Sequence, residues 1–154
     1  MMITEDYVSF ETAKLLKEKG FHEWCRECYG TDVRHNGVSI SFDEELDLKD
    51  EGRGDEIEYV EGGVMHNLNC NNSDKDIYAA PTLSIAMNWL LDTYKLHIVP
   101  TPYPHEDGVF YWAYKIAFLD SETLAVMVVK QKSGFDSKEN ACEDAIKYCL
   151  ENLL

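Results

Sequence analysis

The stretch VFYWAYKIAFLDSETLAVMVVK, residues 109–130, decides the fold of this chain. It consists of two apolar segments, residues 109–119 and 123–130, with a polar turn between them. Successive side chains of a strand point to opposite faces, so a sheet that is wet on one face alternates apolar and polar residues. These segments are instead apolar on both faces, with Lys115 as an interruption. They predict two neighbouring strands of a sheet whose faces are both covered.

A third strand is expected just upstream, at residues 96–103. Asp107-Gly108 is a favoured hairpin turn and would connect it to the next strand. Pro100 and Pro102 suit an edge of the sheet, because proline has no N–H to donate to a neighbouring strand. The sequence therefore predicts a three-stranded antiparallel sheet.

A helix is expected on each side of these strands in the sequence. Residues 82–95 have apolar residues at helical spacing and Thr82 as a candidate N-cap. Residues 137–153 carry Cys142 and Cys149 on an apolar helical face, where cysteine acts as a small hydrophobe. Two arrangements are open. The helices lie on opposite faces of the sheet, or they share one face while the N-terminal module or a second subunit covers the other.

The first half of the chain predicts a smaller module. A helix is expected at residues 9–19, with Ser9 as its N-cap and Gly20 as its left-handed ending. Residues 22–37 show no clear period and are expected to form a loop. A strand is expected to start at Val38, after the turn signal Asn36-Gly37, and to lead into an acidic β-hairpin.

Two domains follow from this pattern. A linker rich in Asn, Ser and Asp spans residues 69–76. The predicted domains are residues 1–76, a helix and acidic hairpin module, and residues 77–154, a helix–strand–strand–strand–helix module. The fold class is α+β.

Composition excludes several classes of function. The chain has 154 residues, 45% of them hydrophobic, which suits a folded core. No apolar run is long enough to cross a membrane, and the start of the chain is not a signal peptide. A formal net charge of −15 disfavours direct binding to nucleic acid or to anionic membranes. Five cysteines without a regular framework agree with a reducing compartment, so we expect a cytoplasmic protein.

The most acidic segment is FDEELDLKDEGRGDEIEYVEGG, residues 42–63. On a calcium-loop template a lysine falls where a ligand oxygen should be, and the flanks are typical of strands instead of helices. A solvated hairpin is the simplest interpretation. The alternative is a surface that imitates nucleic acid and binds a basic partner. The candidate partner-binding residues are Asp43, Glu44, Asp47, Asp50 and Glu51.

A zinc site is a further hypothesis for the first half of the chain. Cys25 and Cys28 form a CxxC pair, and His66 and Cys70 form a second pair of zinc-type ligands. Against the site, the two pairs lie far apart in sequence, and a single CxxC is a weak signal. Reduced cysteines without a metal are the alternative, so no cofactor other than zinc is expected.

Three segments carry a resemblance to known proteins: SKENACEDAIKYCLENLL (residues 137–154), YAAPTLSIAMNWLLDTYKLHI (residues 78–98) and MITEDYVSFETAKLLKEKGF (residues 2–21). They resemble a family of small uncharacterised proteins of bacterial phages and mobile elements, and only about residues 38–69 lie outside the resemblance. The resemblance implies a phage-like context and no catalytic residues. The C-terminal half also resembles a phage domain with helix, sheet and helix layers.

The element order of the C-terminal half is shared with the double-stranded-RNA-binding domain. That domain holds phosphates with a lysine cluster at the start of its last helix. Here Lys138 is followed by Glu139, Glu143 and Asp144, which repel phosphates, so RNA binding is not expected.

We therefore expect a non-enzymatic accessory or protein-interaction protein of a phage or mobile element. No nucleotide-binding glycine loop, nucleophile elbow or HExxH motif is present. The alternatives are an acidic inhibitor that imitates nucleic acid and a zinc-stabilised binding module. The expected partner is a protein, with a homo-oligomer as a further alternative.

Overall fold

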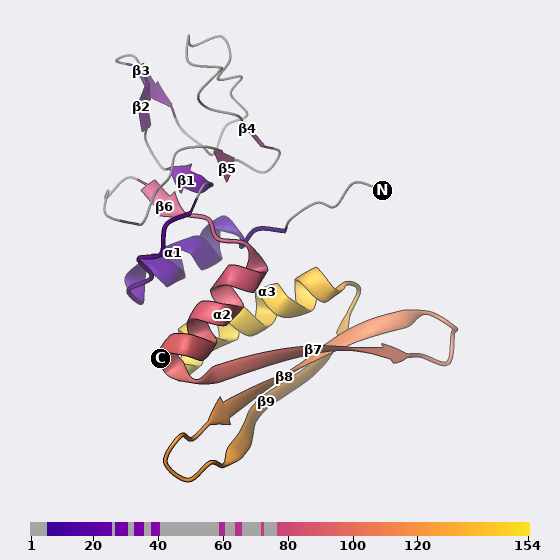
Figure 1. Cartoon of the computed structure of the whole chain (residues 1–154). Helices are drawn as coiled ribbons and strands as arrows, with labels where there is room; N and C mark the ends of the chain where they lie inside the picture. The colour runs from indigo at the N-terminus through magenta and orange to yellow at the C-terminus, as the bar shows by residue number, and fades with distance from the viewer. Residues whose placement is uncertain are drawn as a thin grey trace. The chain divides into compact units, whose positions relative to one another are not determined.

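The chain forms two compact units in a computed structural model, which describes residues 6–25, 27–30, 33–35, 38–40, 59–60, 64–65, 72 and 77–154. Met1–Asp6 together with Thr82–Leu154 form the C-terminal unit, and Tyr7–Pro81 form the N-terminal unit. The α+β class and the three-stranded antiparallel sheet are confirmed (Figure 1). Among the described residues, none of the helices combines the length and the apolar character that a membrane crossing requires.

The C-terminal unit has the predicted order of elements. They are helix α2 (Leu83–Tyr94), strands β7 (Leu96–Pro104), β8 (Phe110–Leu119) and β9 (Val126–Phe135), and helix α3 (Lys138–Tyr148), which continues as a π-helical turn (Cys149–Leu153). The sheet order is β7-β8-β9, and both pairings are antiparallel. β9 extends beyond the predicted end at Lys130, because its polar C-terminal residues still pair with β8.

Side-chain caps fix the starts of both helices, as predicted. The Thr82 hydroxyl accepts from the backbone N–H of Ile85 at 3.2 Å, and the Ser137 hydroxyl accepts from that of Asn140 at 3.1 Å. Each bond satisfies a backbone donor that the first turn of a helix leaves unpaired. Lys95, at a left-handed φ of 59°, ends α2 and leads directly into β7.

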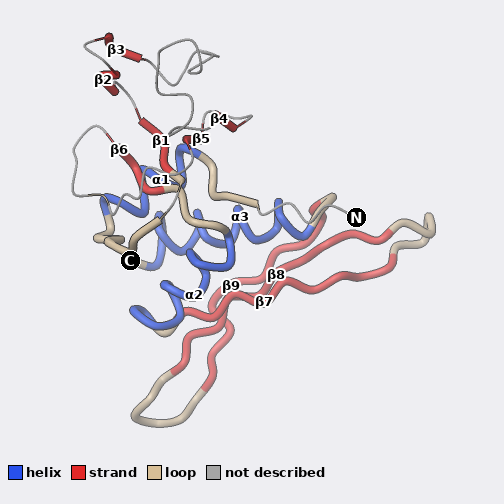
Figure 2. Tube along the Cα trace, turned by 45° about the horizontal axis from the view of Figure 1, so that its top comes forward, coloured by secondary structure: helices blue, strands red, loops and turns tan. Residues whose placement is uncertain are grey.

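Both helices cover the same face of the sheet (Figure 2). Directly opposite residues of antiparallel strands share a face, so the pairs Ile98–Ile116 and Pro100–Tyr114 lie on one side. That side forms the core with the helices, and the largest fully buried side chains of this core are Tyr114, Ile116, Leu90, Ile146 and Leu150. Of the two arrangements left open by the sequence, the helices therefore adopt the shared face. The helix, sheet and helix layers implied by the resemblance are not found in this unit.

The N-terminal unit contains one helix and several short strands. They are α1 (Phe10–Glu18), a sheet of order β4-β5-β1-β6 formed by Tyr59–Val60, Val64–Met65, Cys28–Gly30 and Ile77–Ala79, and a hairpin of β2 (Val33–His35) and β3 (Val38–Ile40). The expectation of a loop at residues 22–37 is wrong, because β1 and β2 lie within it. Each has three residues, too few for a period to show in the sequence.

The predicted first helix is confirmed with both of its ends. The Ser9 hydroxyl accepts from the Thr12 N–H at 3.2 Å. At the other end the N–H of Phe21 bonds to the carbonyl of Leu16 at 2.9 Å, and Gly20 has a φ of 90°. This is the Schellman ending that a glycine followed by a hydrophobic residue favours.

Asn72 connects distant parts of the N-terminal unit. Its side-chain amide donates to the carbonyl of Phe21 at 2.9 Å, and its side-chain oxygen accepts from the N–H of Ala79 at 2.6 Å. Asn72 is buried, although the sequence places it in a linker. β6, which follows it, pairs with β1 and so belongs to the N-terminal unit.

Candidate functional site

The face of the C-terminal sheet opposite the helices, here called the outer face, carries exposed apolar side chains. The strand register places Val99 beside Lys115 and Gln131, and His97 beside Ala117 and Val128, on this face. The exposed fractions are 65% for Val126, 51% for Val128 and 37% for Val99. Clustered exposed apolar residues of this kind mark interaction surfaces more often than single ones do.

The β8–β9 hairpin carries further exposed apolar side chains near its tip, although Met127 pairs with Phe118 and so lies on the opposite face from Val126 and Val128. Leu124 is 85% exposed and Met127 is 55% exposed. The tip itself is ordered by Asp120, whose carboxylate accepts from the backbone N–H groups of Glu122 and Thr123 at 2.9 and 3.2 Å. Hydrogen bonds from the Thr123 side chain and from these backbone groups lower the pKa of Asp120. The tip is thus a defined turn with exposed apolar and acidic groups.

The two edges of the sheet differ in their backbone donors. The Leu119 N–H bonds to the Lys95 carbonyl. From Lys95 onward, the backbone N–H and C=O groups of every second residue therefore bond to β8, and those of the residues between them point away from the sheet. Pro100, Pro102 and Pro104 occupy outward positions, where they present no N–H. β9 contains no proline. The edge of β7 is therefore blocked at these three positions, and the edge of β9 is not.

A pocket of about 330 Å³ lies where the helix-covered side of the sheet meets the last helix. It is lined by Tyr114, Lys130, Lys132, Asp144, Lys147, Tyr148 and Glu151. The Tyr114 hydroxyl donates to Asp144 Oδ2 at 2.8 Å, and Lys132 Nζ lies 3.2 Å from Asp144 Oδ1. Lys130 Nζ lies 4.8 Å from the centre of the Tyr148 ring. Asp144 thus connects the strand lysine and the buried tyrosine to α3.

The electrostatics of this pocket favour structure over acid–base chemistry. Burial, followed by the hydrogen bond to Asp144 and its negative charge, raises the pKa of Tyr114 well above 10.0. The hydroxyl is therefore held in its protonated form as a donor. Burial likewise raises the pKa of Cys149 to about 12 and raises that of Cys142. These buried thiols act as packing residues, as their helical spacing predicts.

The structure places half of the predicted zinc ligands. Cys25 and Cys28 are both buried in the N-terminal unit, whereas His66 and Cys70 lie outside the described residues. Within the described ranges, no group of three His, Cys, Asp or Glu side chains has a metal-binding arrangement. Because two ligands were not described, the four-ligand set stays a prediction.

One residue next to His66 in the sequence pairs directly with Cys28, and one residue near Cys70 is linked to Cys28 through Ala79. β1 pairs with both β5 and β6, which places Met65 and Ala79 opposite Cys28. Met65 directly precedes His66 in the sequence. Asn72, two positions after Cys70, bonds to Ala79, which is itself paired with Cys28. The pairing of Met65 and the hydrogen bond of Asn72 to Ala79 therefore both connect to the strand position of Cys28.

The predicted acidic partner-binding residues cannot be placed. Asp43, Glu44, Asp47, Asp50 and Glu51 all lie outside the described residues, as does most of the predicted acidic hairpin. Of that segment, Tyr59–Val60 forms β4 and pairs with β5. The hypothesis of a surface that imitates nucleic acid stays a prediction.

The sequence did not identify the pocket, because its residues come from three separate elements. The sequence contains a partial signal for this pocket in its two strand lysines. Lys130 and Lys132 are two positions apart in a strand and so point to the same face, where two lysines are unusual beside Ile116 and Tyr114. Asp144, the partner of Lys132, could be found only from the register of β9 and the packing of α3 on the sheet.

Comparisons of the chain with protein-family models, with curated proteins and with solved structures find no match. The outer face, the β9 edge and the pocket are therefore the features from which a function is inferred.

Proposed function

We propose that this chain is a non-enzymatic protein-interaction protein, accessory to a phage or mobile element, which binds its partner through the outer face and the β9 edge. The observation that carries the proposal is the exposed apolar run at residues 126–129. Burial of apolar surface contributes roughly 25 cal/mol per Å², so covering several such side chains supplies a few kcal/mol of binding free energy.

Two further observations support the proposal. The phage-like context is supported by the sequence resemblance of the two terminal segments and the α2 region. At Tyr114 and Cys149 themselves a catalytic role is disfavoured, because burial raises the pKa of each group away from neutral pH. A general acid, a base or a thiolate nucleophile needs a pKa near the working pH.

The test is a comparison of two charge insertions in β9. Val128→Glu places a carboxylate within the apolar part of the outer face, and Ser133→Glu places one on the same face of the same strand, outside the apolar run. Tagged full-length chain, produced in its native cell, is captured together with its partners at physiological salt. We expect the bound partner to be lost with Val128→Glu and retained with Ser133→Glu.

A partner retained equally by both variants would overturn the proposal, provided that both keep the far-ultraviolet circular dichroism of the wild type. Loss of binding in both variants would also contradict it, because the effect would then follow from charge and not from the apolar run.

A zinc-stabilised N-terminal unit is a second candidate, and the pairing of Cys28 with Met65 and with Ala79, to which Asn72 bonds, favours it. Zinc in such a site would add its binding free energy to the folding of a unit whose strands are short. Its test is the zinc content of purified protein for Cys25→Ser, with Cys142→Ala as a control in the other unit. We expect the Cys25→Ser protein to contain no bound zinc and to melt at a lower temperature than the wild type. Wild-type protein that binds no added zinc at stoichiometric concentration would end this candidate.

A further inference from the structure

We infer that the partner on this sheet is a second copy of the same chain, whose β9 pairs antiparallel with β9 across a two-fold axis at Met127. The inference rests on the proposed function and names its partner. It follows from the unequal edges of the sheet, from the direction of the backbone groups in β9, and from the charges beside the apolar run.

The first argument is the contrast between the edges. An unprotected edge strand is a template for pairing with another chain, and proteins block such edges with proline, charge or bulges. β7 has prolines at the outward positions 100, 102 and 104. β9 has none, and its first four residues are Val126, Met127, Val128 and Val129. Protection of β9 begins only with the bulge at Val129 and with Lys130, so the run before them is open to pairing.

The second argument is the direction of the backbone groups. The Asp120 N–H bonds to the Ala125 carbonyl, so the backbone N–H and C=O groups of Ala125 and Met127 point toward β8. Val126 and Val128 therefore point their N–H and C=O groups away from the sheet. Within the described part of the chain, no strand pairs with this side of β9.

These directions fix one register for the pair. With the axis at Met127, Val126 of one copy lies opposite Val128 of the other, and each such pair can exchange both of its N–H···O=C bonds. Directly opposite residues share a face, and Val126 and Val128 both belong to the outer face. The pairing therefore satisfies the outward backbone groups and joins the two outer faces into one apolar surface.

The third argument is charge. Antiparallel pairing takes Lys130 and Lys132 of one copy past the β8–β9 turn of the other, which carries Asp120 and Glu122. β9 contains these two lysines and no acidic residue. Opposite charges therefore lie beside each other on both sides of the axis, whereas a parallel pairing in register would place lysine beside lysine.

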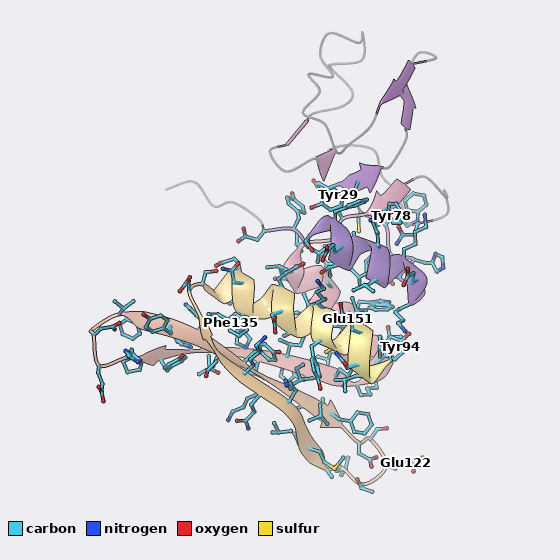
Figure 3. The ribbon with its side chains drawn as sticks, turned by 180° about the vertical axis from the view of Figure 1, so that it is seen from behind. Tyr29, Tyr78, Tyr94, Glu122, Phe135 and Glu151 are labelled. Carbon is cyan, nitrogen blue, oxygen red and sulfur yellow. The ribbon has the colours of Figure 1, made fainter. Side chains whose placement is uncertain are left out.

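Within the C-terminal unit, neither helix covers the tip of the β8–β9 hairpin (Figure 1). In Figure 1 the β8–β9 hairpin extends beyond α2 and α3, and Figure 3 shows Glu122 at its tip, far from α3. A two-fold axis makes the contact isologous, so the same surface is used by both copies and assembly closes at a dimer. The outer edges of the joined sheet are then the two β7 strands, whose prolines limit further growth.

The first test uses Val128→Pro in the full-length chain. It removes an N–H that points away from β8, and so reproduces in β9 the block that β7 already has. Val128→Thr is the matched control, because it is β-branched and keeps the N–H. Sedimentation velocity should show wild type and Val128→Thr as dimers in the micromolar range. Val128→Pro should weaken the dimer by about tenfold or more, because the reciprocal bonds at both pairs are lost or strained.

The second test does not depend on the folding of the proline variant. At the two-fold axis the two Met127 residues form a pair without mutual hydrogen bonds, whose Cα atoms lie about 4.5 Å apart. That separation lies within the range for a disulfide. Met127→Cys should therefore form a covalent dimer under mild oxidation, and Ser133→Cys, farther along β9, should not.

The outcomes separate this inference from the proposed function. Wild-type chain that stays monomeric into the millimolar range overturns the second-copy inference, as does a dimer that Val128→Pro leaves unchanged or equal cross-linking of Met127→Cys and Ser133→Cys. If such a monomer still captures another protein, and loses it with Val128→Glu, the proposed function stands without the dimer. If it captures nothing, both are wrong.

Discussion

Replacement of Tyr114 by Phe tests how the sheet is joined to the last helix. The Tyr114 ring is buried, and its hydroxyl donates to Asp144 at 2.8 Å. Phenylalanine keeps the packing of the ring and removes only the donor. Asp144 keeps Lys132 at 3.2 Å and is partly exposed, so water can replace part of the lost bond.

The magnitude follows from this geometry. A hydrogen bond to a charged group contributes about 1.5–3 kcal/mol, and partial exposure of the acceptor reduces that value. We expect Tyr114→Phe to lower the free energy of unfolding by about 1–2 kcal/mol. The control is Tyr111→Phe, which removes a similar Tyr–Asp bond on the exposed end of β8, to Asp107 at 3.2 Å, and should change stability little.

The pH dependence has a definite sign. Burial raises the pKa of Tyr114 in the folded state above its ordinary value of 10.0. The contribution to stability is therefore complete below pH 10.0 and declines above it, because the unfolded chain releases the proton first. The difference between wild type and Tyr114→Phe should shrink as the pH rises above that value.

The assay is urea unfolding followed by tryptophan fluorescence, since Trp89 and Trp112 lie in this unit. Equal stabilities of Tyr114→Phe and Tyr111→Phe at neutral pH would refute the reasoning. So would a difference from wild type that grows above pH 10.0.

Three further predictions concern single features of the two units. Gly20→Ala should destabilise the N-terminal unit by about 1 kcal/mol, because φ is 90° at this position and an alanine is strained there. No atom crowds the added methyl group, so the expected cost comes from the backbone. Trp24 fluorescence during urea unfolding would measure the change, and an unchanged midpoint would contradict the left-handed ending. Ser137→Ala should cost about 1 kcal/mol by loss of the N-cap, and Ser137→Asp should restore most of it in the same titration, whereas failure of that rescue would argue against the cap. Burial raises the pKa of Cys149 to about 12, so this thiol should react with iodoacetamide far more slowly in native than in denatured protein at mildly alkaline pH. Peptide mass spectrometry would measure the labelling. Equal labelling of native and denatured protein would mean that the last helix opens readily.

Much of the C-terminal unit could be predicted from the sequence, because its elements are long and each carries its own signals. Thr82 and Ser137 mark helix starts, and Asp107-Gly108 marks a hairpin turn. The arrangement of layers could not be predicted. The apolar residues of β8 and β9 suggested covered faces, but periodicity does not say what covers them, and the exposed outer face shows that one side is apolar without a helix.

The N-terminal unit was harder to predict for a physical reason. Strands of two or three residues are too short to show a period, and their position is set by pairing between distant segments, such as Cys28 with Met65 and Ala79. The burial of Asn72 also depends on distant partners. The difference between the β7 and β9 edges could be predicted in part. Pro100 and Pro102 indicated an edge strand, but only the register shows that they stand where an N–H would point out of the sheet.

Amide hydrogen exchange of the full-length protein, followed by NMR at low and high protein concentration, tests the central claim most directly. The N–H groups of Val126 and Val128 point out of the sheet, so they should exchange rapidly in dilute protein and become protected as the concentration rises. Ile98, whose N–H points out of the proline-blocked edge of β7, should exchange rapidly at both concentrations. Rapid exchange of Val126 and Val128 at every concentration, or equal protection of Ile98, would contradict pairing through β9.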